Sequence, residues 1–309
     1  MDRTLTLKLT SIDEADFGRL VEIGTKSAER IGDVVSFTRA DLAAMLKWTR
    51  LGPEGLFAVR DEGVTIGLIR YLRFLDADLP HVLGLITIDP EFRQDDVGDW
   101  AYRQVLERAR QDGAQALDAV VDSRDKEALG FLSRREFERM ATLWTLQAAG
   151  DFAPAGAPRT PSGYVLRAYR PGEDTALLTD MYNRTFAKHL TFCTATEAET
   201  RGFELTPQFD PGLTAILETD DGLPVGYARC TLRSDVKDGW VDILGVLPEY
   251  QGRGLGRFLL LWSMHVLGKG KAKVIRLVVE GVNDRARALY DSEGFMEIRT
   301  RLRYRRRVT

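Results

Sequence analysis

Features that would point to a metal site, a disulfide framework or a membrane are scarce in this 309-residue sequence. It has only two cysteines, Cys193 and Cys230, and three histidines, at positions 81, 189 and 265. Two thiols are too few for a disulfide framework or a zinc site, and scattered histidines suggest no metal cluster. The sequence has no apolar run long enough to span a bilayer and no apolar N-terminal segment flanked by basic residues. We therefore expect a cytoplasmic protein with no metal and no membrane association.

An excess of positive charge is also missing. The formal net charge is −3, whereas a general nucleic-acid binder is usually basic, so we expect no nucleic-acid partner. Hydrophobic residues make up 44% of the chain and charged residues 29%, which is typical of an ordinary folded protein. A chain of this length is long for one domain and sufficient for two, each able to bury a core.

The order of predicted elements occurs twice. Asp89-Pro-Glu-Phe92 matches Leu247-Pro-Glu-Tyr250, and Arg135-Glu-Phe137 matches Glu293-Gly-Phe295, both at an offset of 158 residues (248 − 90 and 295 − 137). Two separated segments that share one offset indicate two copies of one fold. We expect an N-terminal domain over 1–147, an Ala/Pro/Gly-rich linker over 148–163 and a C-terminal domain over 164–309.

Hydrophobic periodicity and turn residues predict the elements of each copy. In the first copy these are strands over 4–9, 56–60, 64–75, 81–89, 117–121 and 137–147, and helices over 13–27, 38–50, 97–112 and 126–134. The equivalent part of the second copy has strands over 240–246 and 273–280, a helix over 257–267, and a final helix capped by Asn283.

A glycine-rich turn in the second copy is the first candidate for a binding site. Gln251-Gly-Arg-Gly-Leu-Gly256 follows a buried strand and opens an apolar helix. Glycines let a ligand approach the backbone, and the first turn of the helix leaves amide N–H groups without partners at its positive end. Such a turn suits a pyrophosphate.

Two patterns compete for this turn. The dinucleotide fingerprint G-x-G-x-x-G begins well at Gly254 and Gly256, and Glu280 could bind a ribose, but Leu259 stands where a small residue is needed. A nicotinamide-dependent oxidoreductase is therefore an alternative. The other pattern is Q/R-x-x-G-x-G/A, the acetyl-CoA loop of the GCN5-related N-acetyltransferases, which Gln251, Gly254 and Gly256 fit.

The segment Asn283 to Phe295 favours the second pattern. Asn283 and Tyr290 are two helical turns apart and project from one face. The segment resembles the last helix of the N-acetyltransferase family, in which the Asn meets the pantetheine arm and the Tyr lies beside the sulfur. The resemblance implies a mixed α/β (α+β) fold, with two tandem acyltransferase domains that each have a mostly antiparallel mixed sheet flanked by helices.

The resemblance also implies acetyl-CoA as cosubstrate and direct acetyl transfer to the amine of a small molecule or peptide. As cofactor-binding residues we expect the main chain of the central strand and the residues of the loop and the last helix: Leu244, Val246, Gln251, Gly252, Arg253, Gly254, Leu255, Gly256, Arg257 and Asn283. The main chain of a splayed strand can bind the pantetheine amides like a sheet edge. Arg253 and Arg257 could equally be solvated surface residues.

The reaction needs a proton acceptor for the amine and a proton donor for the leaving thiolate. Tyr290 is the candidate acid, by spacing and by resemblance to the family. Asp242 is the first candidate base, because strand alternation puts it on one face with Trp240, Leu244 and Val246. Glu218 and Glu280 are the next candidates, and ordered water could replace a dedicated base.

The first copy lacks these groups. Asp96 stands at the place of Gly254, Asp125 at that of Asn283 and Leu132 at that of Tyr290. A carboxylate where a pyrophosphate would bind is unfavourable, since like charges at close range repel. We expect the first copy to be a catalytically silent scaffold, with a remodelled ligand site as the alternative.

Several questions stay open at this stage. A non-enzymatic acyl-CoA sensor or partner-binding module is an alternative to the enzyme, and the sequence leaves the acceptor and the oligomeric state unknown. The tandem arrangement also resembles mycothiol synthases, although Trp240 stands where those enzymes carry a glutamate. We expect Arg299, Arg301, Arg303 and Arg305 to form the solvated face of a strand, and the segment 190–210 to cover the acceptor site.

Overall fold

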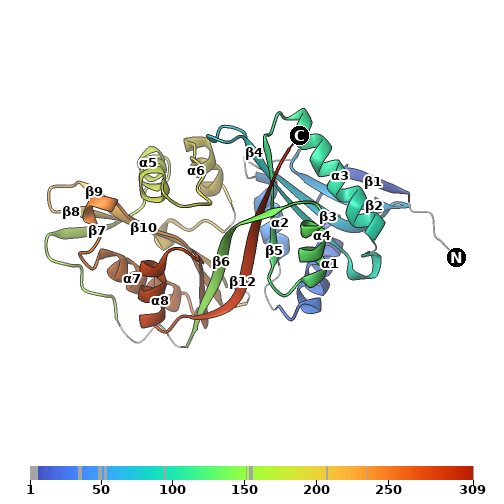
Figure 1. The fold of residues 1–309 in the computed structure, drawn as a ribbon. Coiled ribbons are helices and arrows are strands. Elements are labelled where there is room, and N and C mark those ends of the chain that lie inside the picture. Colours follow the sequence, from blue (N-terminus) through green and yellow to red (C-terminus); the bar gives the residue numbers. More distant parts are fainter. Residues whose placement is uncertain are drawn as a thin grey trace. The chain divides into compact units, whose positions relative to one another are not determined.

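The structure is a computed structural model that describes residues 6–33, 37–47, 51, 54–93, 95–150, 152, 156–206, 208–234 and 236–308. The chain forms two compact units, shown with their elements in Figure 1. Unit 1 consists of Met1–Met140 together with Arg301–Thr309, and unit 2 consists of Ala141–Thr300. Each unit has its own run of hydrogen-bonded strands and its own hydrophobic core.

Unit 1 is a sheet with helices on both faces. Its strands are β1 (Leu7–Ser11), β2 (Leu56–Asp61), β3 (Val64–Phe74), β4 (His81–Ile88), β5 (Ala116–Asp122) and the end of β12 (Met296–Arg307), in that spatial order. Its helices are α1 (Phe17–Arg30), α2 (Arg39–Lys47), α3 (Asp95–Gln111), α4 (Lys126–Ser133) and the short η1 (Pro90–Phe92). The predicted strand residues 4–5 and helix residues 48–50 lie outside the described part of the chain.

Unit 2 repeats this plan. Its strands are β6 (Glu138–Ala149), β11 (Val274–Glu280), β10 (Asp238–Val246), β9 (Pro224–Arg233), β8 (Thr214–Thr219) and β7 (Tyr164–Ala168), in that spatial order. Its helices are α5 (Thr175–Phe186), α6 (Glu197–Glu204), α7 (Leu255–Lys269), α8 (Asp284–Ser292) and the short η2 (Pro211–Leu213) and η3 (Pro248–Tyr250). The recurrence of η1 as η3 confirms the repeat predicted from the two Pro-Glu-aromatic segments.

Helices cover the two faces of each sheet in the same way. In unit 2, α5 packs on one face through Leu178 and Met181, and α7 packs on the other through Phe258 and Leu259. Figure 1 shows α5 and α6 on one side of this sheet and α7 and α8 on the other. The segment 190–210, which we expect to cover the acceptor site, contains α6, and after that expectation we name the side of α5 and α6 the acceptor face. These helices bury the apolar stripes that their sequence periodicity predicts.

The closing strand of each sheet comes from the other half of the sequence. Strand β6, predicted to close the first copy, pairs antiparallel with β11 of unit 2 over Leu143–Ala149. The end of β12 pairs antiparallel with β5 of unit 1 over Arg301–Arg307. The predicted boundary at 147/148 therefore falls inside β6. An alternating pattern predicts a strand but does not identify its partner, because each unit has an equivalent strand, β5 or β11, with which it could pair.

The arginines of β12 correct another expectation. Arg303 is buried, and it donates one hydrogen bond to the fully buried Asp118 on β5 at 2.8 Å, with a second ion-pair contact at 2.6 Å. Arg305 donates two more hydrogen bonds to Asp118, at 2.6 and 2.9 Å. The prediction of a solvated face is therefore wrong for Arg303. The alternation predicts one polar face, but pairing with β5 turns that face toward a buried carboxylate, which compensates the desolvated charge.

Candidate active site

The central strand of unit 2 leaves its parallel neighbour halfway along its length. Strand β10 pairs with β11 from Asp238 to Val241, whereas its pairing with β9 continues to Val246. The Leu247 amide donates to the Val225 carbonyl on the β9 side, at 2.9 Å. Because hydrogen-bonded positions alternate in an antiparallel ladder, the main-chain groups of Leu244 and Val246 point away from β9, toward the side that β11 has left.

The glycine loop follows this free half of β10. Gly252 and Gly254 have φ of 87° and 79°, in the left-handed region, and Gly254 is the N-cap of α7. A Cβ placed on Gly254 would meet no atom within 4 Å, so the space above the loop is open. The first hydrogen bond of the helix runs from the Phe258 amide to the Gly254 carbonyl. The amides of Leu255, Gly256 and Arg257 come before this bond in the first turn, so they have no acceptor within the helix. The loop can therefore accept an anion at the positive end of α7.

Gln251 connects this loop to the strand. Its Nε2 donates to the Val246 carbonyl at 3.0 Å, and its Oε1 accepts from Arg285 on α8 at 3.4 Å. The Arg285 guanidinium also lies 3.6 Å from the position of a Cβ on Gly252. Arg285 is thus an exposed cation beside the loop that the sequence analysis missed. It lies on the polar side of an ordinary amphipathic helix, so no local signal marked it.

The two loop arginines are bound to protein groups. Arg253 donates to the Glu249 carbonyl at 3.1 Å and lies over the Tyr250 ring at 4.8 Å. Arg257 forms an ion pair with Glu293 and donates to the Ser292 hydroxyl. Both side chains are exposed, as one of the two sequence interpretations expects.

Asn283 and Tyr290 lie on α8 as predicted. The Asn283 side chain caps the helix, since its Oδ1 accepts from the Ala286 amide at 3.1 Å. Tyr290 is buried in the core cluster with Leu277 and Val279 of β11, and its ring lies 6.0 Å from that of Phe295. Burial raises the pKa of Tyr290 to about 12, so the phenol keeps its proton at neutral pH.

Asp242 lies at an irregularity in the sheet. The register between β10 and β9 shifts between Val241 and Ile243, which makes Asp242 the extra residue of a β-bulge. Its carboxylate accepts from the Thr231 hydroxyl at 2.6 Å. The Asp242 side chain is exposed at its surface, but the protein atoms packed around the carboxylate desolvate it and raise its pKa above the usual value of an Asp. The charge of Arg229 and the Thr231 hydrogen bond partly oppose this increase.

The bulge also corrects the expectation that Asp242 shares a face with Leu244 and Val246. Leu244 and Val246 pack in the cluster under α7, as Val241 and Cys230 pack in the adjoining core. Thr231, the partner of Asp242, follows Cys230 on β9 and so points to the opposite side, the acceptor face. Simple alternation fails here because the bulge inserts one residue.

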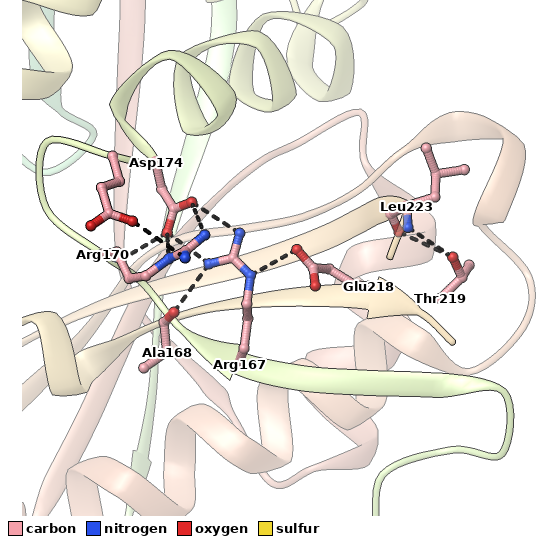
Figure 2. A network of polar contacts seen from close by, with 8 residues as sticks. Arg167, Ala168, Arg170, Asp174, Glu218, Thr219 and Leu223 are labelled. Atoms are coloured by element: carbon pink, nitrogen blue, oxygen red, sulfur yellow. Dashed lines mark hydrogen bonds and ion pairs between the residues drawn. The ribbon is translucent and has the colours of Figure 1, made fainter. Parts of the chain in front are cut away.

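The other two candidate bases are engaged elsewhere. Figure 2 shows Glu218 accepting from Arg167, which also bridges to Asp174 at the start of α5. Glu280, at the end of β11, is buried and accepts from the Leu190 and Thr191 amides at 3.2 and 2.8 Å. Glu280 therefore ties the segment between α5 and α6 to the strand that diverges from β10.

Unit 1 closes the equivalent region with charge. Asp125 caps α4 at the place of Asn283 and accepts from Arg30 of α1 and Arg93 of the loop. At the repeat offset of 158 residues, Leu255 at the start of α7 corresponds to residue 97, whereas α3 already begins at Asp95. The counterpart of the left-handed Gly254 therefore lies within a helix. The Val97 amide donates to the carboxylate of this residue, Asp96, at 2.9 Å. An anion-binding amide is thus taken by the chain itself.

Among the described residues, no helix has the length and apolar character needed to cross a membrane. Nor do the same residues contain a group of three or more His, Cys, Asp or Glu side chains placed to hold a metal ion.

Comparisons with known proteins agree with this geometry. The Acetyltransferase (GNAT) family profile matches residues 22–137 and again 177–295. The mycothiol acetyltransferase of Stackebrandtia nassauensis is 27% identical over 266 residues, which are 83% of this chain and 84% of that protein. That of Beutenbergia cavernae is 35% identical over 178 residues, or 54% of this chain and 59% of that protein.

A solved structure, a tandem GNAT protein from the clavulanic acid biosynthesis pathway, superimposes with a TM-score of 0.77 at 16% identity, covering 98% of this chain and 99% of that chain. At this identity the likeness concerns the fold alone. The two matches of the family profile together span more than half of the sequence. The chain therefore belongs to the acetyltransferase (GNAT) family, as a member with two tandem domains.

Proposed function

We propose that unit 2 is an acetyl-CoA-dependent N-acetyltransferase and that unit 1 is its catalytically silent scaffold. The observation that carries this proposal is the free half of β10 beside the left-handed glycine loop. It combines the main-chain groups of Leu244 and the amide of Val246, whose own carbonyl is bound by Gln251, with the amides at the start of α7. This combination suits the amides of a pantetheine arm followed by a pyrophosphate.

The residues of unit 2 fit acetyl-CoA in specific ways. The Leu255, Gly256 and Arg257 amides would bind the pyrophosphate, and Arg285 would add a positive charge beside Gly252. The Asn283 amide nitrogen would donate to the pantetheine arm, since the Asn283 oxygen caps α8. When bound, acetyl-CoA supplies the activated acetyl group.

Proton transfer is assigned to two side chains. Asp242 would take a proton from the attacking amine, for which its raised pKa is suited, because a base works best near the operating pH. Tyr290 would donate a proton to the leaving thiolate, because burial keeps its phenol protonated at neutral pH. In this scheme the acetyl group passes directly from thioester to amine.

Titration of acetyl-CoA by calorimetry tests the proposal. The wild type should bind one equivalent, and Gly254→Asp should lose binding, because the substitution adds a carboxylate at the pyrophosphate position and strains a left-handed residue. Gly222→Asp is the matched control, since Gly222 in the β8–β9 turn also has a left-handed φ, of 83°, and no atom within 4 Å of its Cβ position.

Gly222→Asp should bind acetyl-CoA like the wild type. Binding that survives in Gly254→Asp would instead assign the ligand to unit 1. Binding without turnover on any amine would support the alternative of a non-enzymatic acyl-CoA sensor.

The acceptor of the mycothiol acetyltransferases is a second candidate within this function. It is favoured by the identity of 27% to 35% to proteins of that name. Against it stands Trp240, because the resemblance to mycothiol synthases implies a glutamate at this position. Trp240 has an indole in place of a carboxylate, and its N–H donates to Asp238 at 3.2 Å. Acetylation of a cysteinyl amine conjugate, measured beside simple amines, distinguishes this acceptor from others.

A further inference from the structure

Arg229 lies at the candidate active site and, within the described residues, forms no ion pair and donates no side-chain hydrogen bond. It lies in the middle of β9, opposite Ile243 of β10, and shares the acceptor face with Thr231, the partner of Asp242. Among the residues that the structure describes, no carboxylate lies within 4.0 Å of its guanidinium and no group accepts a hydrogen bond from it; its Nε is buried. The side chain as a whole is only half-buried.

Other arginines of unit 2 on the sheet behave differently. Arg167 is paired with Asp174 and Glu218, and Arg276 with Asp238. A partly desolvated charge without a counter-ion is unfavourable, so proteins usually pair it. Arg229 differs because Asp242 acts on its charge only at a distance, so among the described residues its N–H groups remain available to a bound anion.

The orientation of Arg229 is held by an aromatic platform. Its Cζ lies 3.8 Å from the centre of the Phe203 ring. Phe203 packs edge-on against Phe209, which packs edge-on against Tyr169, with ring centres 5.5 and 6.1 Å apart. A stacked guanidinium keeps its N–H groups in one plane and can donate two parallel hydrogen bonds to a planar carboxylate.

Arg229 and the candidate base lie close enough to serve one small molecule. The positive charge of Arg229 lowers the pKa of Asp242, yet the two groups do not form an ion pair within 4.0 Å. They stand on neighbouring strands, where side chains on one face are about 5 to 8 Å apart. A molecule with an amine and a carboxylate a few bonds apart matches this spacing, with the amine toward Asp242.

We propose that Arg229 binds a carboxylate of the acceptor and that unit 2 therefore acetylates an amine of the amino acid type. This inference rests on the proposed acetyltransferase function and names the acceptor class of the same site. It excludes acceptors that carry only uncharged groups beside the amine.

A paired substrate panel tests the inference. Initial rates of acetyl transfer are measured with L-amino acids and with the carboxamide of each, which keeps the amine and the side chain but removes the negative charge. For the preferred amino acid, wild-type kcat/KM should exceed that for its carboxamide by about 10- to 100-fold, as expected for charge-assisted hydrogen bonds.

Two substitutions separate charge from shape. Arg229→Met retains packing on Phe203 without the charge, and it should raise the KM for the amino acid by about the same factor while leaving that for the carboxamide and for acetyl-CoA unchanged. Arg229→Lys retains the charge but loses the planar guanidinium, so its KM for the amino acid should lie between those of the wild type and Arg229→Met. Arg170→Met, which removes an exposed arginine of unit 2, is the control and should keep the wild-type preference.

Folding and binding are followed separately from turnover. Circular dichroism and the acetyl-CoA dissociation constant should be unchanged in Arg229→Met, and stabilisation by the amino acid in a thermal melt should be lost.

Equal rates with acids and carboxamides, or an unchanged preference in Arg229→Met, would overturn the inference while the acetyltransferase function stands. A preference for phosphoethanolamine over every amino acid would overturn the carboxylate assignment. Turnover of no amine at all would remove the proposed function, and the inference with it.

Discussion

The two units of this chain have the same element order but differ in one strand and one loop. In unit 2 the central strand β10 carries a bulge at Asp242, and a left-handed Gly254 precedes α7. In unit 1 the equivalent strand β4 pairs with β3 in one continuous register, and α3 starts two residues earlier. Both central strands diverge from their parallel neighbours, after Leu83 and after Val241.

This comparison teaches that the divergence alone does not make a ligand site. In unit 1 the ion pairs of Arg30 and Arg93 with Asp125 occupy the region that the glycine loop leaves open in unit 2. Without the bulge, β4 also presents no counterpart of Asp242, since Gly84 stands at that position of the repeat. The fold is thus shared, and under the proposed function a few residues separate a silent scaffold from a catalytic domain.

Tyr290→Phe should produce the largest effect on catalysis. Loss of a general acid typically lowers kcat by about 10²- to 10⁴-fold, and the substitution leaves the packing of the ring unchanged. Steady-state rates with a saturating acceptor measure it. Tyr169→Phe is the control, because its hydroxyl bonds to Glu204, a structural contact in the same unit. An unchanged kcat in Tyr290→Phe would refute the assignment of the acid.

Asp242→Asn should lower kcat/KM by about 10²-fold and remove the acidic limb of its pH profile. The base works only when ionised, so wild-type activity should fall as pH drops through the raised pKa of Asp242, which lies above the usual 3.8. Since a raised pKa means that folding disfavours the charge, Asp242→Asn should be at least as stable at pH 7. Glu218→Gln should keep the wild-type pH profile of kcat/KM. Loss of the acidic limb in Glu218→Gln, and not in Asp242→Asn, would assign the base to Glu218.

Asp118→Asn should affect unit 1 and spare unit 2. It removes the carboxylate that compensates the buried Arg303, and an uncompensated buried charge costs about 3 to 5 kcal/mol. Hydrogen exchange at the β5 and β12 amides should increase, whereas the acetyl-CoA dissociation constant should stay within about twofold. Equal loss of exchange protection in β10 would show that the two units do not unfold separately.

Asp96→Gly should have the smallest effect. It removes the carboxylate that takes the Val97 amide in unit 1, but the ion pairs around Asp125 remain. We therefore expect no second binding event in calorimetry with acetyl-CoA. A second equivalent bound by this variant would contradict the interpretation of unit 1 as closed by several independent contacts.

The sequence by itself determined the features that depend on local order. The sequence predicts the repeat, the Asn-capped α8, the glycine-rich turn before α7 and the strand that precedes it, all within a few residues. They follow from residue types at adjacent positions, where conformational preference acts without help from distant groups. Family membership follows from the same short motifs.

Tertiary structure alone decided which partners these elements meet. The sequence predicted β6 and β12 as strands, but only long-range pairing assigns β6 to β11 and the end of β12 to β5. The bulge at Asp242 and the stacking of Arg229 on Phe203 join residues from separate elements, so no local period reveals them. The physical reason is that pairing register and charge compensation are settled by groups distant in sequence, which meet only in the folded chain.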